Sequence, residues 1–105
     1  MYISDYIGQK GLEFNQICGH FPIAKLYAFG SATTNAFDQQ NSDIDLVIEL
    51  NTLDPLQRGE ALIQIWDKLE SFFQRKVDLI TLSSLKNPIL KRSIEESKVL
   101  IYEKA

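Results

Sequence analysis

The sequence is poor in the residues that build disulfides and metal sites. Among its 105 residues there is one cysteine, Cys18, and one histidine, His20. A single cysteine cannot form an internal disulfide, and one cysteine with one histidine cannot complete a zinc site. We therefore expect Cys18 to be a small core residue and His20 to lie at the end of a helix.

Long apolar runs and blocks of basic residues are also missing. No apolar stretch approaches the length of a membrane-spanning helix, and the first residues lack the basic and apolar regions of a signal peptide. The formal net charge is −3, and the absence of clustered Lys and Arg argues against a large nucleic-acid footprint. These absences predict a cytoplasmic protein with no membrane contact and no direct nucleic-acid binding.

What is present is the composition of an ordinary folded domain. Hydrophobic residues make up 45% of the chain and charged residues 24%, which is typical of soluble globular proteins. A chain of this length buries well over half of its surface without covalent staples. We expect one domain that spans residues 1–105.

Hydrophobic periodicity divides the chain into helices and strands. The order predicted is helix, strand, strand, helix, strand, helix, strand, which indicates an α/β or α+β fold: a small β-sheet with helices packed on it. The apolar and aromatic stripe of the second helix is typical of core packing. The predicted ranges are helices at 3–19, 60–74 and from Ser83 or Ser84 to 97, with the main part beginning near Pro88, and strands at 24–29, 43–50, 76–81 and 98–103.

Two aspartates open the strongest of these strands. Asp43 and Asp45 are separated only by Ile44, and alternate side chains of a strand point to the same face. Both carboxylates therefore project together, where one would take up a proton unless a cation neutralised the pair. A carboxylate pair of this kind favours a hard divalent cation such as Mg²⁺, together with substrate phosphates.

A third aspartate, Asp78, lies in the apolar strand predicted at 76–81. Taken alone, it is typical of the solvated face of a half-exposed strand. If this strand neighbours the one at 43–50, three carboxylates meet on one face of the sheet. Such a set holds two Mg²⁺ ions, which activate an attacking oxygen and stabilise a leaving pyrophosphate.

A Gly-Ser pair follows the first predicted strand. Gly30 permits a tight turn and a close approach to a ligand. If one or two helical turns begin at Ser31, their free N–H groups form an anion site, and the hydroxyl reaches a phosphate oxygen. A lone Gly-Ser is most often a turn and a helix cap, and it becomes informative here because it precedes the Asp-x-Asp strand.

Together these motifs resemble the signature of the polymerase-β nucleotidyltransferase superfamily. The resemblance is closest to the minimal nucleotidyltransferase family, also called MNT or MntA-like. Its common pattern is Phe-Gly-Ser, a spacer and Ser-Asp-Ile-Asp-Leu, which residues 29–31 and 42–46 match. Residues 75–80 match the strand that carries the third acidic residue. The similarity covers essentially the whole chain.

The resemblance implies a fold and an activity. The fold is a small mixed sheet with helices on one side. The activity is Mg²⁺-dependent transfer of a nucleoside monophosphate, AMP from ATP, to an acceptor hydroxyl. Many members are encoded beside a HEPN-domain ribonuclease toxin and act as its antitoxin, and some adenylylate a tyrosine of that toxin. The implied partners are ATP or another nucleoside triphosphate and a HEPN-domain toxin protein, with homo-oligomerisation left open.

The same resemblance assigns roles to individual residues. In the family the first two aspartates bind both metal ions and the third helps to activate the acceptor. Metal and catalytic roles therefore fall to Asp43, Asp45 and Asp78. The nucleotide-binding positions are Gly30, Ser31 and Ser42.

The chain departs from the family pattern after Gly-Ser. Ala32 and Thr34 stand where the family often has Arg, and Asn35 stands in place of Gly. Each charge-assisted hydrogen bond to a triphosphate is worth ~1.5–3 kcal/mol. The departures therefore keep a second hypothesis open: a catalytically weak or inactive module that neutralises a partner protein by contact. Transfer to a small molecule such as an aminoglycoside is a third, less favoured because no separate acceptor-binding domain is present.

Overall fold

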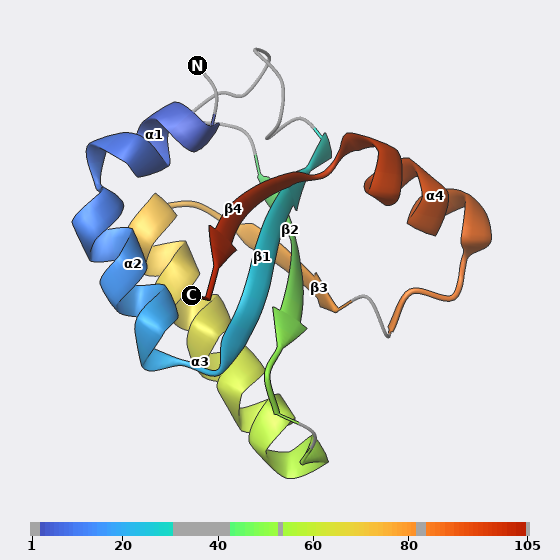
Figure 1. Cartoon of the computed structure of the whole chain (residues 1–105), viewed down its shortest axis with the longest axis horizontal. Helices are drawn as coiled ribbons and strands as arrows, with labels where there is room; N and C mark the ends of the chain where they lie inside the picture. Colours follow the sequence, from blue (N-terminus) through green and yellow to red (C-terminus); the bar gives the residue numbers. More distant parts are fainter. Residues whose placement is uncertain (1–2, 31–42, 53, 82–83, 105) are drawn as a thin grey trace.

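The computed structural model describes residues 3–30, 43–52, 54–81 and 84–104. Within these residues the chain forms a mixed four-stranded sheet with four helices (Figure 1), which confirms the predicted fold class. In chain order the elements are α1 (Ile3–Gln9), α2 (Gly11–His20), β1 (Ile23–Phe29), β2 (Ile44–Leu50), α3 (Pro55–Phe73), β3 (Val77–Thr81), α4 (Pro88–Ser97) and β4 (Val99–Glu103). None of the helices found there is both long and apolar enough to cross a membrane.

The single helix predicted at 3–19 is wrong, because the structure divides it into α1 and α2. Lys10 stands between them with φ −124° and ψ 33°, outside the helical region. Its N–H donates to the carbonyl of Ile7 at 3.0 Å, which closes α1 with a tight last turn. Gly8 and Gly11 flank the break, and glycine weakens a helix by about 1 kcal/mol relative to alanine.

The later elements agree with the prediction apart from their ends. Helix α3 begins at Pro55 rather than at residue 60, because Asp54 caps it and accepts a hydrogen bond from the N–H of Leu56 at 3.0 Å. Asn87 caps α4 in the same way, ahead of Pro88. Proline fits the first turn of a helix, where its missing N–H has no intrahelical partner. The predicted turns at 31–37 lie outside the described residues.

The strand order is β3-β2-β1-β4. Strand β1 runs antiparallel to both β2 and β4, whereas β2 and β3 are parallel. The end of β1 therefore lies beside the start of β2, since Phe29 pairs with Asp45. The start of β3 lies there too, because Ile44 pairs with Val77. This topology brings three separate stretches of sequence to one corner of the sheet.

One face of the sheet carries the core. Helices α1, α2 and α3 gather on this face (Figure 1), and their buried apolar side chains pack with alternate residues of β1, β2 and β3. An aromatic cluster joins α1 and α2 to the end of α3: the rings of Tyr6 and Phe14 lie 5.8 Å and 5.4 Å from that of Phe72. The Tyr6 hydroxyl also donates to the Phe72 carbonyl at 3.2 Å.

Cys18 is a core residue, as predicted, and it is fully buried in α2. Burial raises the pKa of its thiol to about 12, so almost no thiolate is present at neutral pH. We therefore expect the native protein to react with an aromatic disulfide reagent at least about tenfold more slowly than the same chain in denaturant. Equal rates in the two states would contradict this burial.

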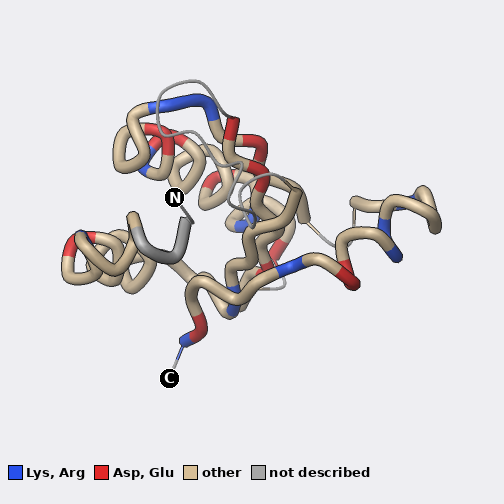
Figure 2. Tube along the Cα trace, turned by 90° about the horizontal axis from the view of Figure 1, so that it is seen from above, with Lys and Arg blue, Asp and Glu red and all other residues tan. Residues whose placement is uncertain are grey.

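The expectation that the helices lie on one side of the sheet is wrong for α4. Helix α4 lies on the other side from α1–α3 and projects from the body of the domain (Figures 1 and 2). Its Ile94 is buried, as is Val47 of β2, yet neither belongs to the main core cluster. Just after α4, the ammonium group of Lys98 lies 4.3 Å from the ring centre of Tyr27.

Candidate active site

The candidate site is built on the face of the sheet that is turned away from α1, α2 and α3. In β2, Ile44 and Leu46 belong to the core cluster, so Asp45 between them points to the other face. In β3 the same argument applies to Asp78, which lies between core residues Val77 and Leu79. Asp45 and Asp78 therefore project from the same face of the sheet, and the predicted common face of Asp43 and Asp45 stays a prediction.

Asp45 and Asp78 are direct neighbours across the sheet. The parallel pairing of β2 and β3 places them opposite each other in register. Side chains opposite each other in paired strands lie close together on one face. Asp45 is half-buried and Asp78 is exposed. The neighbouring strands on which the three-carboxylate hypothesis depended are thus present.

Asp43 is exposed and stands immediately before β2. The next residue, Ile44, donates its N–H to the carbonyl of Lys76 at 3.0 Å. This hydrogen bond ties the start of β2 to the residue just before β3. Asp43 is thereby held at the same corner as Asp45 and Asp78.

The surroundings of this corner shift the pKa of Asp45. Its pKa is raised above the usual value of 3.8, first by burial and then by the negative charges of Asp78 and Asp43. All three causes oppose ionisation of Asp45, whereas a bound cation would favour its ionised form. The carboxylate oxygens present here are the ligands that Mg²⁺ prefers, especially when substrate phosphates complete its shell. The donor set therefore fits a divalent metal.

The three carboxylates do not form a closed cage. Among the described residues, no three His, Cys, Asp or Glu side chains gather closely enough to hold a metal ion. A Mg²⁺ ion at this corner therefore needs oxygen ligands from a nucleotide or from water as well. The predicted two-ion arrangement, and the metal and catalytic roles of Asp43, Asp45 and Asp78, stay predictions.

Gly30 borders the site from β1. It has φ +66°, in the left-handed region that favours glycine. A β-carbon at this position would lie only 3.0 Å from Oδ2 of Asp45, closer than nearly all real contacts of this kind. Glycine therefore suits this position in two ways: it adopts the left-handed backbone without strain, and it leaves room for the carboxylate beside it. The other two predicted nucleotide-binding residues, Ser31 and Ser42, lie outside the described residues.

Sequence reasoning missed two α3 residues that support the site. The indole Nε1 of Trp66 donates to the carbonyl of Val77 at 2.6 Å, and Oε2 of Glu70 accepts from the N–H of the same residue at 3.0 Å. Val77 directly precedes Asp78. Trp66 fitted the apolar stripe of a core helix, yet it is 38% exposed. Its spacing of four residues from Glu70 is the only sign in the sequence that the two act together.

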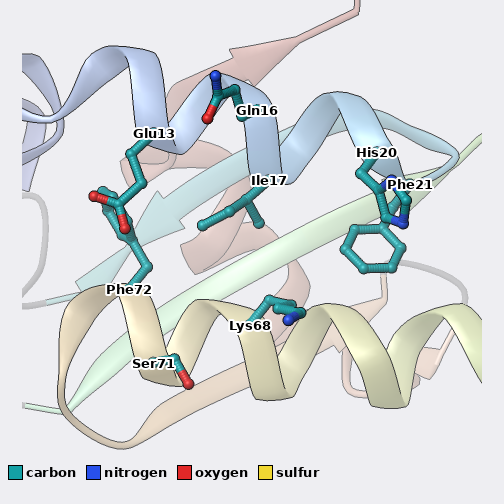
Figure 3. A pocket seen from close by; sticks show the side chains of 8 residues that line it. All are labelled: Glu13, Gln16, Ile17, His20, Phe21, Lys68, Ser71 and Phe72. Atoms are coloured by element: carbon teal, nitrogen blue, oxygen red, sulfur yellow. The ribbon is translucent and has the colours of Figure 1, made fainter.

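A separate groove of about 480 Å³ lies between α2 and α3 (Figure 3). Glu13 and His20 line it from α2, and Lys68 and Ser71 line it from α3. Both helices belong to the layer that covers the core face of the sheet, whereas Asp45 and Asp78 are on the other face. The groove is therefore not part of the candidate active site.

Comparison with known proteins finds relatives over most of the chain. The sequence model of the family described as "Nucleotidyltransferase domain" matches residues 13–101. Two curated proteins of Methanocaldococcus jannaschii, named provisionally as protein adenylyltransferases, are each 35% identical to this chain. The matches cover 77% and 78% of the chain and 79% and 78% of the relatives.

Solved structures share the fold. A protein described provisionally as a minimal nucleotidyltransferase has a TM-score of 0.64 at 17% identity, over 94% of this chain and 95% of that one. A toxin–antitoxin crystal structure with AMP-PNP gives 0.63 at 24% identity, over 88% and 72%. The complex of the tri-AMPylated Shewanella oneidensis HEPN toxin with its MNT antitoxin gives 0.52 at 24% identity, over 90% and 72%.

Proposed function

The chain belongs to the nucleotidyltransferase family, and we propose that it is a minimal, MntA-like member that transfers AMP from ATP to a hydroxyl group of a partner protein. The observation that carries this proposal is the in-register pair of Asp45 and Asp78, with Gly30 packed against Asp45. Support for protein as the acceptor comes from the provisional names of the Methanocaldococcus relatives.

In this reaction each site residue has a defined task. Asp43 and Asp45 would hold Mg²⁺, which would supply positive charge to the phosphates and to the leaving pyrophosphate. Asp78 accepts the proton of the acceptor hydroxyl while the hydroxyl oxygen forms a bond to the α-phosphorus. The bond from that phosphorus to the β-phosphate oxygen breaks, and pyrophosphate leaves. Gly30, Ser31 and Ser42 are proposed to contact the nucleotide.

The proposed partner is a HEPN-domain toxin, which the chain inactivates as an antitoxin. This part rests on the fold shared with antitoxins in solved toxin–antitoxin structures, one of which contains a tri-AMPylated HEPN toxin. The exposed position of Asp78 suits a macromolecular acceptor, because a hydroxyl of another protein reaches it without entering a closed pocket.

The test is label transfer from α-³²P-ATP to a HEPN protein encoded beside this chain, in the presence of Mg²⁺. We expect label on the partner, and its loss with EDTA or in the double variant Asp43→Asn, Asp45→Asn. Glu49→Gln is the matched control, because it neutralises an acid on the same strand and face four residues from Asp45. Absence of transfer, or undiminished transfer by the double variant, would contradict the proposal.

A second candidate function is neutralisation of the partner by contact alone. It is favoured by the absence, among the described residues, of three ligating side chains gathered around one point. It predicts that a folded triple variant, with Asp43, Asp45 and Asp78 all changed to Asn, still restores growth to cells that express the toxin. Loss of protection by that variant would reject the contact mechanism and favour catalysis.

A further inference from the structure

Strand β3 lies at the edge of the described sheet, with β2 on one side only. Backbone groups on the outer side of an edge strand have no strand partner and must be satisfied by water or by side chains. At Val77 both outer groups are satisfied by α3: its carbonyl by Trp66 at 2.6 Å and its N–H by Glu70 at 3.0 Å.

Val77 is therefore held from three directions. Its side chain is fully buried in the core, its outer backbone groups bind Trp66 and Glu70, and on the inner side β2 pairs with it through Ile44. The next residue is Asp78, whose carboxylate projects to the opposite face beside Asp45.

We infer that Trp66 and Glu70 are positioning residues for Asp78. They act through the backbone of Val77 and set where the Asp78 carboxylate stands relative to Asp45. This inference rests on the proposed function, in which Asp78 takes the proton of the acceptor hydroxyl. A displacement of well under 1 Å at such a group slows the chemical step, because proton transfer needs hydrogen-bond geometry.

The consequence is a separation of kinetic effects. Metal binding is assigned to Asp43 and Asp45 and nucleotide binding to Gly30, Ser31 and Ser42, whereas Trp66 and Glu70 bind the backbone of Val77. Loosening the start of β3 therefore lowers kcat and leaves the KM for ATP nearly unchanged. A general loss of structure would change both parameters together, or would lower the fraction of folded enzyme.

The variants are chosen to isolate the hydrogen bonds. Glu70→Leu removes the acceptor for the Val77 N–H, whereas Glu70→Gln removes the charge and keeps an acceptor oxygen. Trp66→Phe removes the indole N–H and keeps an aromatic body. Asp67→Leu is the matched control, since it makes the same kind of change at an exposed acid three residues earlier on α3.

We expect kcat to fall about tenfold in Glu70→Leu and in Trp66→Phe, with the KM for ATP within about twofold of wild type. The kcat of Glu70→Gln should lie within about threefold of the wild-type value. The kcat of Asp67→Leu should equal that of wild type. Unchanged kcat in both Glu70→Leu and Trp66→Phe, or a KM that rises as far as kcat falls, would overturn the positioning role. Trp66→Phe decides the question if Glu70→Leu does not fold.

A second readout separates this inference from the proposed function. If the wild-type chain transfers no nucleotide, the proposed function fails, and hydrogen exchange at the backbone amide of Asp78, which faces β2, decides the positioning role. Exchange about tenfold faster in Glu70→Leu than in Asp67→Leu would support it. Equal exchange in the two variants would overturn it.

Discussion

Asp45→Asn is expected to remove nearly all nucleotidyl transfer while it stabilises the metal-free fold. The loss of activity follows from the proposed role of Asp45 as a metal ligand beside the phosphates. A metal ion contributes several kcal/mol of charge stabilisation in such reactions, and each 1.36 kcal/mol is a factor of ten in rate. We expect the rate of label transfer to fall by about 10³-fold at saturating ATP and Mg²⁺.

The gain in stability follows from the pKa of the same group. Burial, Asp78 and Asp43 raise the pKa of Asp45 above 3.8 in the folded protein, so the folded state binds this proton more tightly than the unfolded state does. Stability from this group is present at low pH and is lost as pH rises through the raised pKa. Asn carries no charge, so the variant avoids that loss at neutral pH and its Tm should exceed that of wild type.

Calorimetry in EDTA at pH 7 and at pH 4 checks the predicted gain in stability of Asp45→Asn. The difference in Tm between Asp45→Asn and wild type should be larger at pH 7 than at pH 4, because a larger fraction of Asp45 is ionised at the higher pH. Added Mg²⁺ and ATP should raise the Tm of wild type and leave that of the variant nearly unchanged. Glu49→Gln serves as the control, and a lower Tm for Asp45→Asn than for wild type at pH 7 would contradict the repulsion.

Mg²⁺ binding should be pH-dependent for the same reason. A proton and a cation compete for Asp45, and the raised pKa brings this competition closer to neutral pH. We expect the apparent affinity for Mg²⁺ and ATP to fall as pH is lowered toward the raised pKa. In Asp78→Asn one source of repulsion is gone, so the fall in affinity should begin at a lower pH. Titration calorimetry between pH 5 and 8 measures this affinity in wild type and in Asp78→Asn. The same pH dependence in the two proteins would contradict repulsion between Asp45 and Asp78.

The aspartate corner was predictable from sequence because strand periodicity fixes side-chain direction. Ile44 and Leu46 had to face the core, which forced Asp45 to the other side, and the same logic applied to Asp78. The pairing of β2 with β3 did not follow from periodicity, because a strand pattern does not say which strand lies next to it. The resemblance to a known family supplied that step, and the register of Asp45 with Asp78 agrees with it.

What sequence reasoning missed depends on contacts between distant segments. The break at Lys10 was hidden because apolar residues on both sides of it share one periodic pattern, and tertiary packing of Tyr6 on the end of α3 favours two short helices. The contacts of Trp66 and Glu70 with Val77 join positions eleven and seven residues apart across a turn. A helical pattern predicts which side faces the core and carries no information on such edge contacts.

Gly30→Ala is expected to damage both stability and activity. Alanine at φ +66° costs about 1–2 kcal/mol relative to glycine, which corresponds to a fall in Tm of roughly 5–10 °C for a domain of this size. The new β-carbon would also stand 3.0 Å from Oδ2 of Asp45, so the carboxylate must move by a few tenths of an ångström. We expect transfer to fall about tenfold as a result.

Gly59→Ala is the matched control, because Gly59 lies within α3 and nothing stands within 4 Å of the β-carbon that alanine would add. It should stabilise the protein by roughly 0.5–1 kcal/mol, since alanine favours a helix more than glycine does. Its transfer rate should match that of wild type. If Gly59→Ala also lowered the Tm, the fall in Tm of Gly30→Ala would not be specific to position 30.

Gly30→Asn separates the two causes of damage at Gly30. Asparagine tolerates the left-handed region better than alanine does, so the Tm should recover by about half of the loss seen in Gly30→Ala. Its β-carbon still meets Oδ2 of Asp45, so transfer should stay about tenfold below wild type. If activity recovers together with stability, backbone strain alone explains the glycine. If stability recovers and activity does not, Gly30 is glycine because the Asp45 carboxylate occupies the space where a β-carbon would stand.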